Sequence, residues 1–445
     1  MASYIPHTQD DVRQMLSAIG VDHLEDLFKD ILPRHRPRSF RLPEGLSEWE
    51  VTDRLKTLAD KNRSSLTLFV GGGYYDHYIP AVVDALTRRG EFLTAYTPYQ
   101  AECSQGTLQA LYEYQGMICA LTGMEAANAS LYDGGTALCE AVMMAARLTG
   151  RKKVIVDEGV NPIYRQMLRT YTRNLHFSLC EVPSRAGRID RKRVAECLDA
   201  STAAVIGQNP NFFGVVENQA DLAAMAHRHG ALAVQSVYPI ALGLMKPPGE
   251  MDMDIVTGEG QSLGLPLNFG GPYLGFMATR KKYMRKMPGR IVGATVDRLG
   301  RRCFVNTLQA REQHIRRQKA TSNICTNVAW CAVRAAVFLS VLGRQGLWEM
   351  ARLNADKAAY LRKRLAVIDG VRILEDVAVF NEFTVRFPRK ASEVVERMAE
   401  KGFAAGFPLE KYYPDLDKSM VVAVTEKRSR SEMDRYAQAL EEVLS

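Results

Sequence analysis

The sequence lacks the features of a membrane or secreted protein. No apolar run approaches the ~18 residues that a membrane-spanning helix needs, and the most apolar segment, residues 329–343, is interrupted by Arg334. The opening residues, MASYIPHTQDD, contain no basic segment followed by an apolar one, so no signal peptide is expected. We therefore expect a cytoplasmic protein without a membrane partner.

Cysteine and histidine patterns argue against a disulfide framework and a metal site. The chain has 8 cysteines, and none stands in a C-x-x-C pair, so reduced, mostly buried thiols are expected. His227 and His229 lie two residues apart, and residues at that spacing do not face each other on a helix. No other group of His, Cys and Asp has the spacing of metal ligands.

The charge balance is mild. Lys and Arg number 58 against 50 for Asp and Glu, a net charge of +8 that is not gathered into a tail. This excess favours acidic partners weakly and does not require a nucleic acid. At 445 residues the chain is long for a single core, which predicts two domains with an additional arm.

The first 65 residues predict a helical arm. Thr8 with Asp11, and Ser47 with Glu50, have the spacing of capping boxes, and Gly20 can end the first helix. The expected helices are HTQDDVRQMLSAIG (7–20), DHLEDLFKDILP (22–33) and LSEWEVTDRLKTLADKN (46–62). Such an arm is too small for its own core. It is expected to pack on a neighbouring surface through its apolar side chains Leu16, Ile19, Leu24, Leu27 and Phe28.

Residues 66–325 predict a large α/β domain, because short β-rich runs alternate with helical stretches. The β-rich runs are LTLFV (66–70), KKVIVDEG (152–159), HFSLCEVP (176–183), AAVIGQNP (203–210), ALAVQSV (231–237), DIVTGEG (254–260) and YLGFMATR (273–280). A long helix at about 325–366 follows. The tail then reads strand, strand, helix, strand, helix, so residues 326–445 predict a linking helix and a small α+β domain.

Two glycine-rich segments are ambiguous. The turn in ASLYDGGTALCEA (129–141) joins a strand to a helix, where backbone N–H groups could hold an anion such as a phosphate. A plain tight turn is the favoured explanation, and no nucleotide-binding glycine pattern is present. In FVGGGYYDHYIP (69–80), the bend could line a ligand or allow a close backbone approach. His77 is interpreted as a structural histidine.

Two polar segments are harder to explain by packing. The loop from Tyr96 to Gln100 places polar aromatic residues beside Pro98, as in many site walls. The run REQHIRRQKATSNICTN (311–327) begins as a basic surface and continues into small polar residues that could cap a helix or bind an anion.

These segments carry a family resemblance. FLTAYTPYQAECSQGTLQALYEYQGMICALTGMEAANASLYDGGTALCEA, PLNFGGPYLGFMATR and REQHIRRQKATSNICTN closely resemble the glycine cleavage system P-protein. The similarity runs over nearly the whole chain and concerns the N-terminal half of that protein, which in many organisms is a separate chain, subunit 1. It implies the type I fold of pyridoxal-phosphate (PLP) dependent transferases, with a mostly parallel seven-stranded sheet and a small C-terminal domain.

The resemblance also implies a reaction and partners. Members of the family decarboxylate glycine on PLP and transfer the aminomethyl group to the lipoyl arm of the H-protein. The implied assembly is an α2β2 heterotetramer with subunit 2, which supplies PLP. The basic run at 279–290 or the one at 311–319 is expected to help receive the H-protein, which is typically acidic in this family.

The catalytic anchors of that family are absent here. PLP needs a lysine for its Schiff base and an acidic residue beside the pyridine nitrogen. By alignment of patterns, Ser236 stands where the acid is expected, and Gln261 and Ser262 stand where the catalytic relatives have His-Lys. No lysine lies between Lys246 and Lys281. We therefore expect no PLP on this chain, and an independent PLP enzyme is excluded.

A chain of this kind can still line its partner's site, because type I enzymes place active sites between two large domains. The candidate lining residues are Tyr96, Thr97, Tyr99, Gln100, Arg316, Lys319, Thr321, Ser322 and Asn323. Interface packing without ligand contact is the alternative for these segments. For the whole chain, the alternative function is a non-catalytic scaffold or regulatory pseudoenzyme.

Overall fold

The computed structural model describes residues 6–37, 39, 41–268, 270–373 and 377–445, which form two compact units, 1–65 and 66–445. In the first unit, α1 (Gln9–Ile19) and α2 (Glu48–Ala59) begin with the predicted capping boxes, and Gly20 ends α1 in a left-handed conformation. The predicted middle helix is wrong, because this stretch forms the short 3₁₀ helices η1 (Leu24–Phe28) and η2 (Pro33–His35).

The second unit is built on a seven-stranded sheet with the order β2-β10-β9-β8-β7-β3-β4. Strand β10 runs antiparallel to both neighbours, and the other pairs are parallel. The predicted mostly parallel α/β sheet is thus confirmed. Its strands are β2 (Ala126–Ala127), β3 (Lys153–Asp157), β4 (Ser178–Val182), β7 (Thr202–Asn209), β8 (Leu232–Val237), β9 (Ile255–Glu259) and β10 (Gly275–Thr279).

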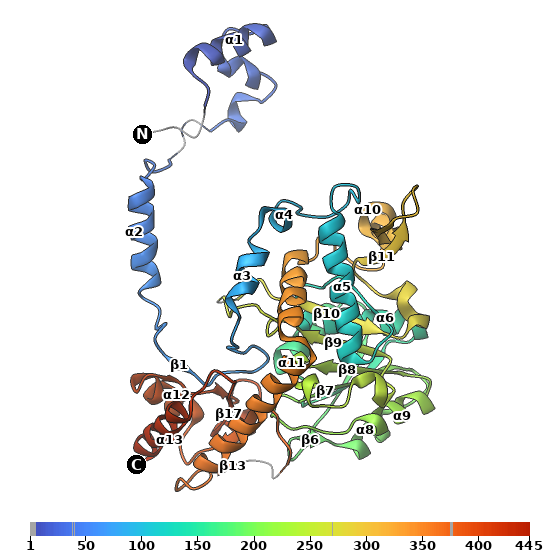
Figure 1. Ribbon diagram of the computed structural model, residues 1–445, viewed down its shortest axis with the longest axis vertical. Coiled ribbons are helices and arrows are strands. Elements are labelled where there is room, and N and C mark those ends of the chain that lie inside the picture. Colours follow the sequence, from blue (N-terminus) through green and yellow to red (C-terminus); the bar gives the residue numbers. More distant parts are fainter. Residues whose placement is uncertain (1–5, 38, 40, 269, 374–376) are drawn as a thin grey trace. The chain divides into compact units, whose positions relative to one another are not determined.

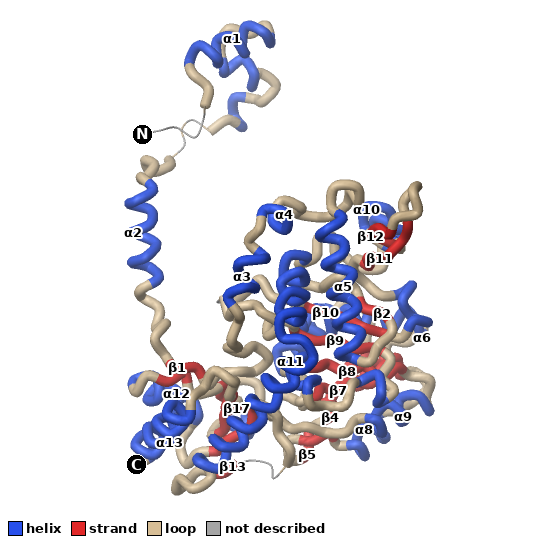
Figure 2. The backbone as a smooth tube through the Cα atoms, in the orientation of Figure 1, coloured by secondary structure: helices blue, strands red, loops and turns tan. Residues whose placement is uncertain are grey.

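Helices cover both faces of this sheet, because alternate side chains along each strand enter separate cores. In β3, Ile155 packs in the core with α5, α9 and α11, whereas Val154 and Val156 pack with α6 and α7. Figures 1 and 2 show α5 and α11 crossing in front of the strands. The helices are α3 (Ala81–Thr87), α4 (Gly90–Leu93), α5 (Gln105–Thr122), α6 (Gly134–Thr149), α7 (Pro162–Thr172), α8 (Arg191–Cys197), α9 (Ala220–Arg228), α10 (Gln313–Arg316) and α11 (Ala329–Leu365).

The identity of one sheet strand was predicted incorrectly. Only Thr67–Leu68 of the first β-rich run forms a strand, β1, and it pairs with β15 (Phe403–Ala404) outside the large sheet. The seventh place is taken by β2, whose two residues are too few to show an alternating pattern. Outside this sheet, the hairpins β11 (Ile291–Val296)–β12 (Arg302–Thr307) and β5 (Ser184–Arg185)–β6 (Arg188–Ile189) complete the region before α11.

The C-terminal segment has the predicted α+β pattern. A four-stranded antiparallel sheet, β13-β14-β17-β16, carries α12 (Ala391–Glu400) and α13 (Arg430–Leu444). Its strands are β13 (Arg372–Ile373), β14 (Glu382–Arg386), β16 (Phe407–Pro408) and β17 (Ser419–Ala423). Residues 374 and 375 of the predicted first strand lie outside the described residues. The long linking helix α11 is interrupted at Gly343, where φ is 59° and ψ is −172°.

Six further 3₁₀ helices connect these elements: η3 (Pro239–Gly243), η4 (Pro248–Met251), η5 (Lys281–Lys286), η6 (Gln309–Arg311), η7 (Arg317–Lys319) and η8 (Pro414–Leu416). Within the described ranges, no helix has the length and apolar character to cross a membrane.

Candidate active site

A small cavity lies at the carboxyl edge of the parallel strands, the usual ligand position in such sheets. The cavity, here called the sheet-edge cavity, has a volume of about 30 Å³, whereas ligand pockets typically have about 300–1,000 Å³. Residues of the seven-stranded sheet and of the four-stranded C-terminal sheet line it, together with residues of loops and helices. Those used below are Tyr75, Tyr164, Ser236, Tyr238, Glu259 and Glu382. The site that the fold offers for a ligand is thus nearly filled by the chain's own side chains.

The Glu259 carboxylate occupies the amino end of α6. It accepts hydrogen bonds from the N–H groups of Gly134 at 2.9 Å, Gln261 at 2.9 Å and Leu274 at 3.0 Å. Asp133 caps the same helix by accepting from the Thr136 N–H at 2.8 Å. The glycine turn predicted from sequence could hold an anion, and in the fold that anion is the protein's own carboxylate.

Gln261, in the position aligned with the histidine of His-Lys, is fully hydrogen-bonded. Its Oε1 accepts from the Tyr75 N–H at 2.9 Å, and its Nε2 donates to the carbonyls of Tyr75 at 3.0 Å and Leu265 at 2.7 Å. Ser262 is buried directly beside it in the chain. The segment that would carry the Schiff-base lysine therefore holds the Gly71–Tyr75 bend in place.

Glu382 closes the cavity from the C-terminal sheet. Its carboxylate accepts from the Gly72 N–H at 2.6 Å and from the Tyr75 hydroxyl at 2.9 Å. A Cβ atom at Gly71 would clash with this carboxylate, which explains the glycine there as a close approach of the backbone. Burial raises the pKa of both Glu382 and Glu259 to about 7.

PLP does not fit the sheet-edge cavity. Ser236 and Ser262 are both buried, and neither offers the charge or the amine that the cofactor requires. Glu259 already accepts from the Gly134 N–H at the amino end of α6, so that N–H is not available to an anionic group. His77 belongs to the same packed region, with Nδ1 2.7 Å from Glu426 Oε2 and Nε2 hydrogen-bonded to the Tyr238 hydroxyl. Both ring nitrogens thus have partners within the chain, as expected of a structural histidine.

The Tyr96–Gln100 loop presents its two tyrosines differently. Tyr96 is 81% exposed, while Tyr99 is 48% exposed and its hydroxyl accepts a hydrogen bond from Arg290 Nη2 at 2.8 Å. The Pro98 carbonyl accepts from Asn306 Nδ2 at 2.7 Å, and the Tyr99 N–H donates to the Thr97 carbonyl at 2.8 Å. The loop is therefore anchored at its centre. Gln100 is exposed beside it.

The basic segment is only partly a solvated surface. Arg311 is half-buried, and its guanidinium donates to the carbonyls of Leu308, Met287 and Gly289. Burial lowers the pKa of Arg311. By contrast, Arg316 and Lys319 are exposed, as is Asn323. The run thus combines a structural arginine with exposed cations.

Hydrogen bonds to the rest of the chain hold the turn at residues 321–324, which follows these cations. The Thr321 N–H donates to the Arg311 carbonyl at 2.8 Å. The Ser322 hydroxyl donates to Glu140 Oε1 at 2.7 Å and accepts from the Ile324 N–H at 3.1 Å. Burial raises the pKa of Glu140. Small polar residues at this turn therefore have defined hydrogen-bonding roles.

Arg290 brings the two predicted segments together, because it contacts Tyr99 in one and the Cys325–Asn327 turn in the other. The segments Tyr96–Gln100 and Arg311–Asn327 are called the polar wall below. Sequence reasoning missed Arg290, Glu140 and Glu382. The basic run at 279–290 contains Arg290, but nothing in the run separates this buried arginine from its exposed neighbours.

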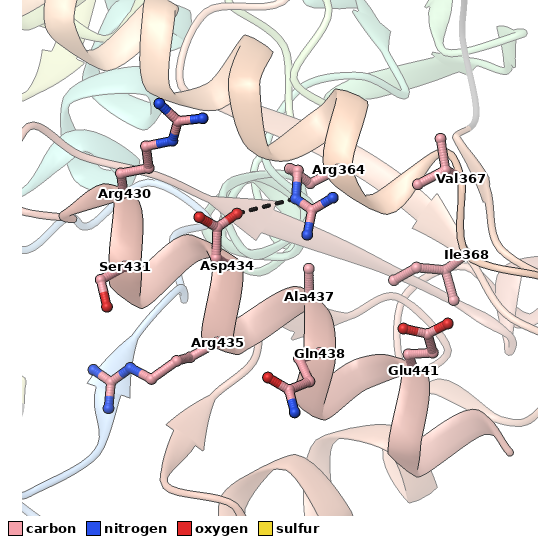
Figure 3. A pocket seen from close by; sticks show the side chains of 10 residues that line it. All are labelled: Arg364, Val367, Ile368, Arg430, Ser431, Asp434, Arg435, Ala437, Gln438 and Glu441. Atoms are coloured by element: carbon pink, nitrogen blue, oxygen red, sulfur yellow. Dashed lines mark hydrogen bonds and ion pairs between the residues drawn. The ribbon is translucent and has the colours of Figure 1, made fainter.

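A groove between α11 and α13, shown in Figure 3, is a weaker candidate. Its central charges neutralise one another, since Arg364 Nε lies 3.0 Å from Asp434 Oδ1. The Tyr360 hydroxyl also donates to Asp434, at 2.7 Å. For a metal, the described part of the chain contains no group of three or more His, Cys, Asp or Glu side chains suited to hold one.

Comparisons with known proteins agree with this geometry. The chain matches the glycine cleavage system P-protein family over residues 2–440. It is 58% identical over 442 residues to the probable glycine dehydrogenase (decarboxylating) subunit 1 of Geotalea uraniireducens (strain Rf4), covering 99% of this chain and 100% of that protein. For the protein of the same description in Nitratidesulfovibrio vulgaris (strain Hildenborough), the identity is 51% over 441 residues, covering 99% and 100%.

A solved structure is similar over its full length. The crystal structure of glycine decarboxylase (P-protein) of the glycine cleavage system, in inhibitor-bound form, has a TM-score of 0.94 at 44% identity, covering 100% of both chains. The sphingosine-1-phosphate lyase of Burkholderia pseudomallei K96243 shares only the fold, with a TM-score of 0.67 at 15% identity over 92% of this chain and 93% of that one. This is the PLP-dependent transferase fold, and the chain belongs to the glycine cleavage system P-protein family.

Proposed function

We propose that this chain is the non-PLP-bearing subunit of a glycine decarboxylase, working in the cytoplasm in an α2β2 complex with a PLP-bearing subunit 2. The observation that carries the proposal is the contrast within one molecule. The sheet-edge cavity is nearly filled by side chains that include Glu259 and Glu382, and Gln261 bonds the backbone of Tyr75, which lines it. The polar wall, in contrast, keeps tyrosines, cations and a small polar turn at the surface.

In this function the partner supplies PLP, which accepts the electrons released when glycine loses its carboxyl group. This chain contributes the polar wall to the partner's site. Exposed Arg316 and Lys319 provide positive charge for an anionic group, and Thr321, Ser322 and Asn323 provide short polar side chains. Tyr96 and Tyr99 add phenol groups, and Thr97 and Gln100 complete the loop. Because internal hydrogen bonds already hold the polar wall in the folded chain, its side chains need not be ordered again at each turnover.

The product is proposed to leave on the lipoyl group of an H-protein. An acidic carrier would be attracted to the basic surface around η5, where Lys281 and Lys282 are exposed. Lys282 Nζ lies over the Tyr283 ring at 4.7 Å, which keeps its charge near the surface. Attraction of this kind acts mainly on the rate of association and is weakened by salt.

Co-expression with the lysine-bearing subunit 2 tests the proposal. The complex is expected to exchange labelled carbon dioxide with the glycine carboxyl group, whereas each subunit alone is expected to be inactive. The purified chain alone is expected to show no yellow absorbance of an internal aldimine. Activity of subunit 2 without this chain would support the scaffold alternative, and yellow absorbance of this chain alone would contradict the alignment of Gln261 and Ser262.

A further inference from the structure

Arg290 is a nearly buried arginine that contacts both segments of the polar wall, and only 3% of its surface is exposed. Its Nη2 donates to the Tyr99 hydroxyl at 2.8 Å and to the Cys325 carbonyl at 2.6 Å. Its Nη1 donates to Asn327 Oδ1 at 3.1 Å. One guanidinium therefore binds the loop and the turn that sequence separates by more than 200 residues.

The Tyr99 ring is also held by stacking. The Arg290 guanidinium carbon lies 4.8 Å from the ring centroid, and the His314 ring meets it edge-on with centroids 5.7 Å apart. Glu312 supplies the countercharge, with Oε2 3.6 Å from Arg290 Nε. A buried arginine needs such pairing. The result is a Tyr99 side chain fixed by a hydrogen bond, a cation and a second ring.

Polar atoms around this network still have hydrogen-bonding capacity. Glu140 Oε2, Glu312 Oε1 and Asn327 Nδ2 are buried and have no hydrogen-bond partner within the described chain. Buried polar atoms in native proteins are normally paired. All three belong to side chains that contact or adjoin the polar wall.

We propose that Arg290 is the positioning residue of the polar wall, holding Tyr99 and the Cys325–Asn327 turn in one arrangement that the partner's glycine site requires. This inference rests on the proposed function. Arginine suits the role because its planar guanidinium keeps its charge and directs several N–H groups at fixed angles. A lysine keeps the charge but loses that fixed geometry, so it cannot hold the same three acceptors.

The test uses the assembled complex with Arg290→Lys in this chain. We expect kcat for glycine-dependent carbon dioxide exchange to fall at least tenfold, with KM for glycine changed less than twofold. The visible absorbance of the partner's PLP is expected to stay unchanged. Hydrogen–deuterium exchange is expected to accelerate in peptides covering 96–100 and 320–327. In a Tyr99→Phe background, Arg290→Lys is expected to lower kcat by a smaller factor than it does in the wild-type background, because the hydrogen bond between Arg290 and Tyr99 is already lost there.

Arg334→Lys is the matched control. Arg334 is equally buried, pairs with Asp84 at 2.5 Å and lies over the Trp330 ring at 5.6 Å, but it belongs to α11 outside the polar wall. It is expected to lower thermal stability without the change in kcat or in the exchange of the two peptides. If Arg290→Lys prevents assembly, Asn327→Ala, which removes a single acceptor, is read by the same measurements.

The outcomes separate the two proposals. A wild-type complex without exchange activity contradicts the proposed function, while the deuterium exchange of the two peptides still reports on Arg290. Normal kcat in Arg290→Lys, multiplicative effects with Tyr99→Phe, or the same loss in Arg334→Lys would each overturn the positioning role.

Discussion

The Gln261 side chain pairs with both backbone groups of Tyr75, accepting from its N–H at 2.9 Å and donating to its carbonyl at 3.0 Å. The two residues are 186 positions apart in sequence. The Gln261 amide thus satisfies backbone groups of the buried Gly71–Tyr75 bend, as a neighbouring strand would do within a sheet. The segment for which the family resemblance predicted the vacated lysine position therefore has a structural role in this fold.

Gln261→Ala should destabilise the chain. It removes the partner of the buried Tyr75 N–H and of the Leu265 carbonyl, whereas the Tyr75 carbonyl still accepts from the His77 N–H at 3.2 Å. Each group left without a partner costs about 1–3 kcal/mol. We expect the free energy of unfolding in urea to fall by about 2–4 kcal/mol. Gln109→Ala serves as the control, because Gln109 is an exposed glutamine that bonds only Glu113 on α5. Equal small effects in both variants would contradict the structural role.

The stability of the chain should depend on pH between about 4.5 and 7. Burial raises the pKa of Glu259, Glu382 and Asp157 to about 7 in the folded state. The folded chain then binds more protons than the unfolded chain in this window, so the free energy of unfolding falls as pH rises and levels off above about 7. Urea unfolding at several pH values between 5 and 8 measures this change in the free energy of unfolding.

Glu382→Gln isolates one of these carboxyls, because the amide resembles the protonated acid. The slope between pH 5 and 7 is expected to become shallower by up to about 1.4 kcal/mol per pH unit. An unchanged slope would mean that Glu382 does not titrate in this range.

The tyrosines of the polar wall should affect turnover. Tyr96→Phe and Tyr99→Phe each remove only a hydroxyl. We expect at least one to lower the turnover of the assembled complex by roughly tenfold or more, about 1.4 kcal/mol. Size-exclusion chromatography checks that the complex remains intact. Normal turnover in both variants would remove the hydroxyls from the mechanism and favour the scaffold alternative.

The helical arm should need a partner surface. Leu16 is buried within unit 1–65, but Ile19, Leu24, Leu27 and Phe28 are exposed, and no described residue of α2 is buried. Exposed apolar surface of this kind favours association. Light scattering on the isolated chain is expected to show self-association or low stability, relieved when subunit 2 is added. A stable monomer unaffected by subunit 2 would contradict this expectation.

The exposed lysines of η5 should matter for the carrier. Lys281→Glu with Lys282→Glu is expected to raise the apparent KM for H-protein, and more strongly at low salt, because screening weakens surface electrostatics. Glycine exchange at saturating H-protein should change little. If the double variant and the wild-type complex have the same KM for H-protein at every salt concentration, these lysines are ordinary solvated surface.

The sequence by itself determined the local structure and the missing chemistry. Capping boxes at Thr8 and Ser47 predicted where helices begin, because caps depend on residues three positions apart. The alternation of short apolar strands with helical stretches along the chain predicted the α/β sheet, because helices cover both faces of such a sheet. The absence of lysine between Lys246 and Lys281 predicted that the vacated position forms no Schiff base. None of these inferences needs a long-range contact.

Only the tertiary structure decided what fills the empty site and what supports the polar wall. Glu259 reaches the amino end of α6, 125 positions earlier, and Glu382 reaches Gly72, 310 positions earlier. Arg290 meets Tyr99 across 191 positions, although it lies in a basic run that otherwise looks solvated. Such contacts depend on which buried groups meet when distant parts of the chain pack together. Periodicity and local spacing carry no information about that pairing.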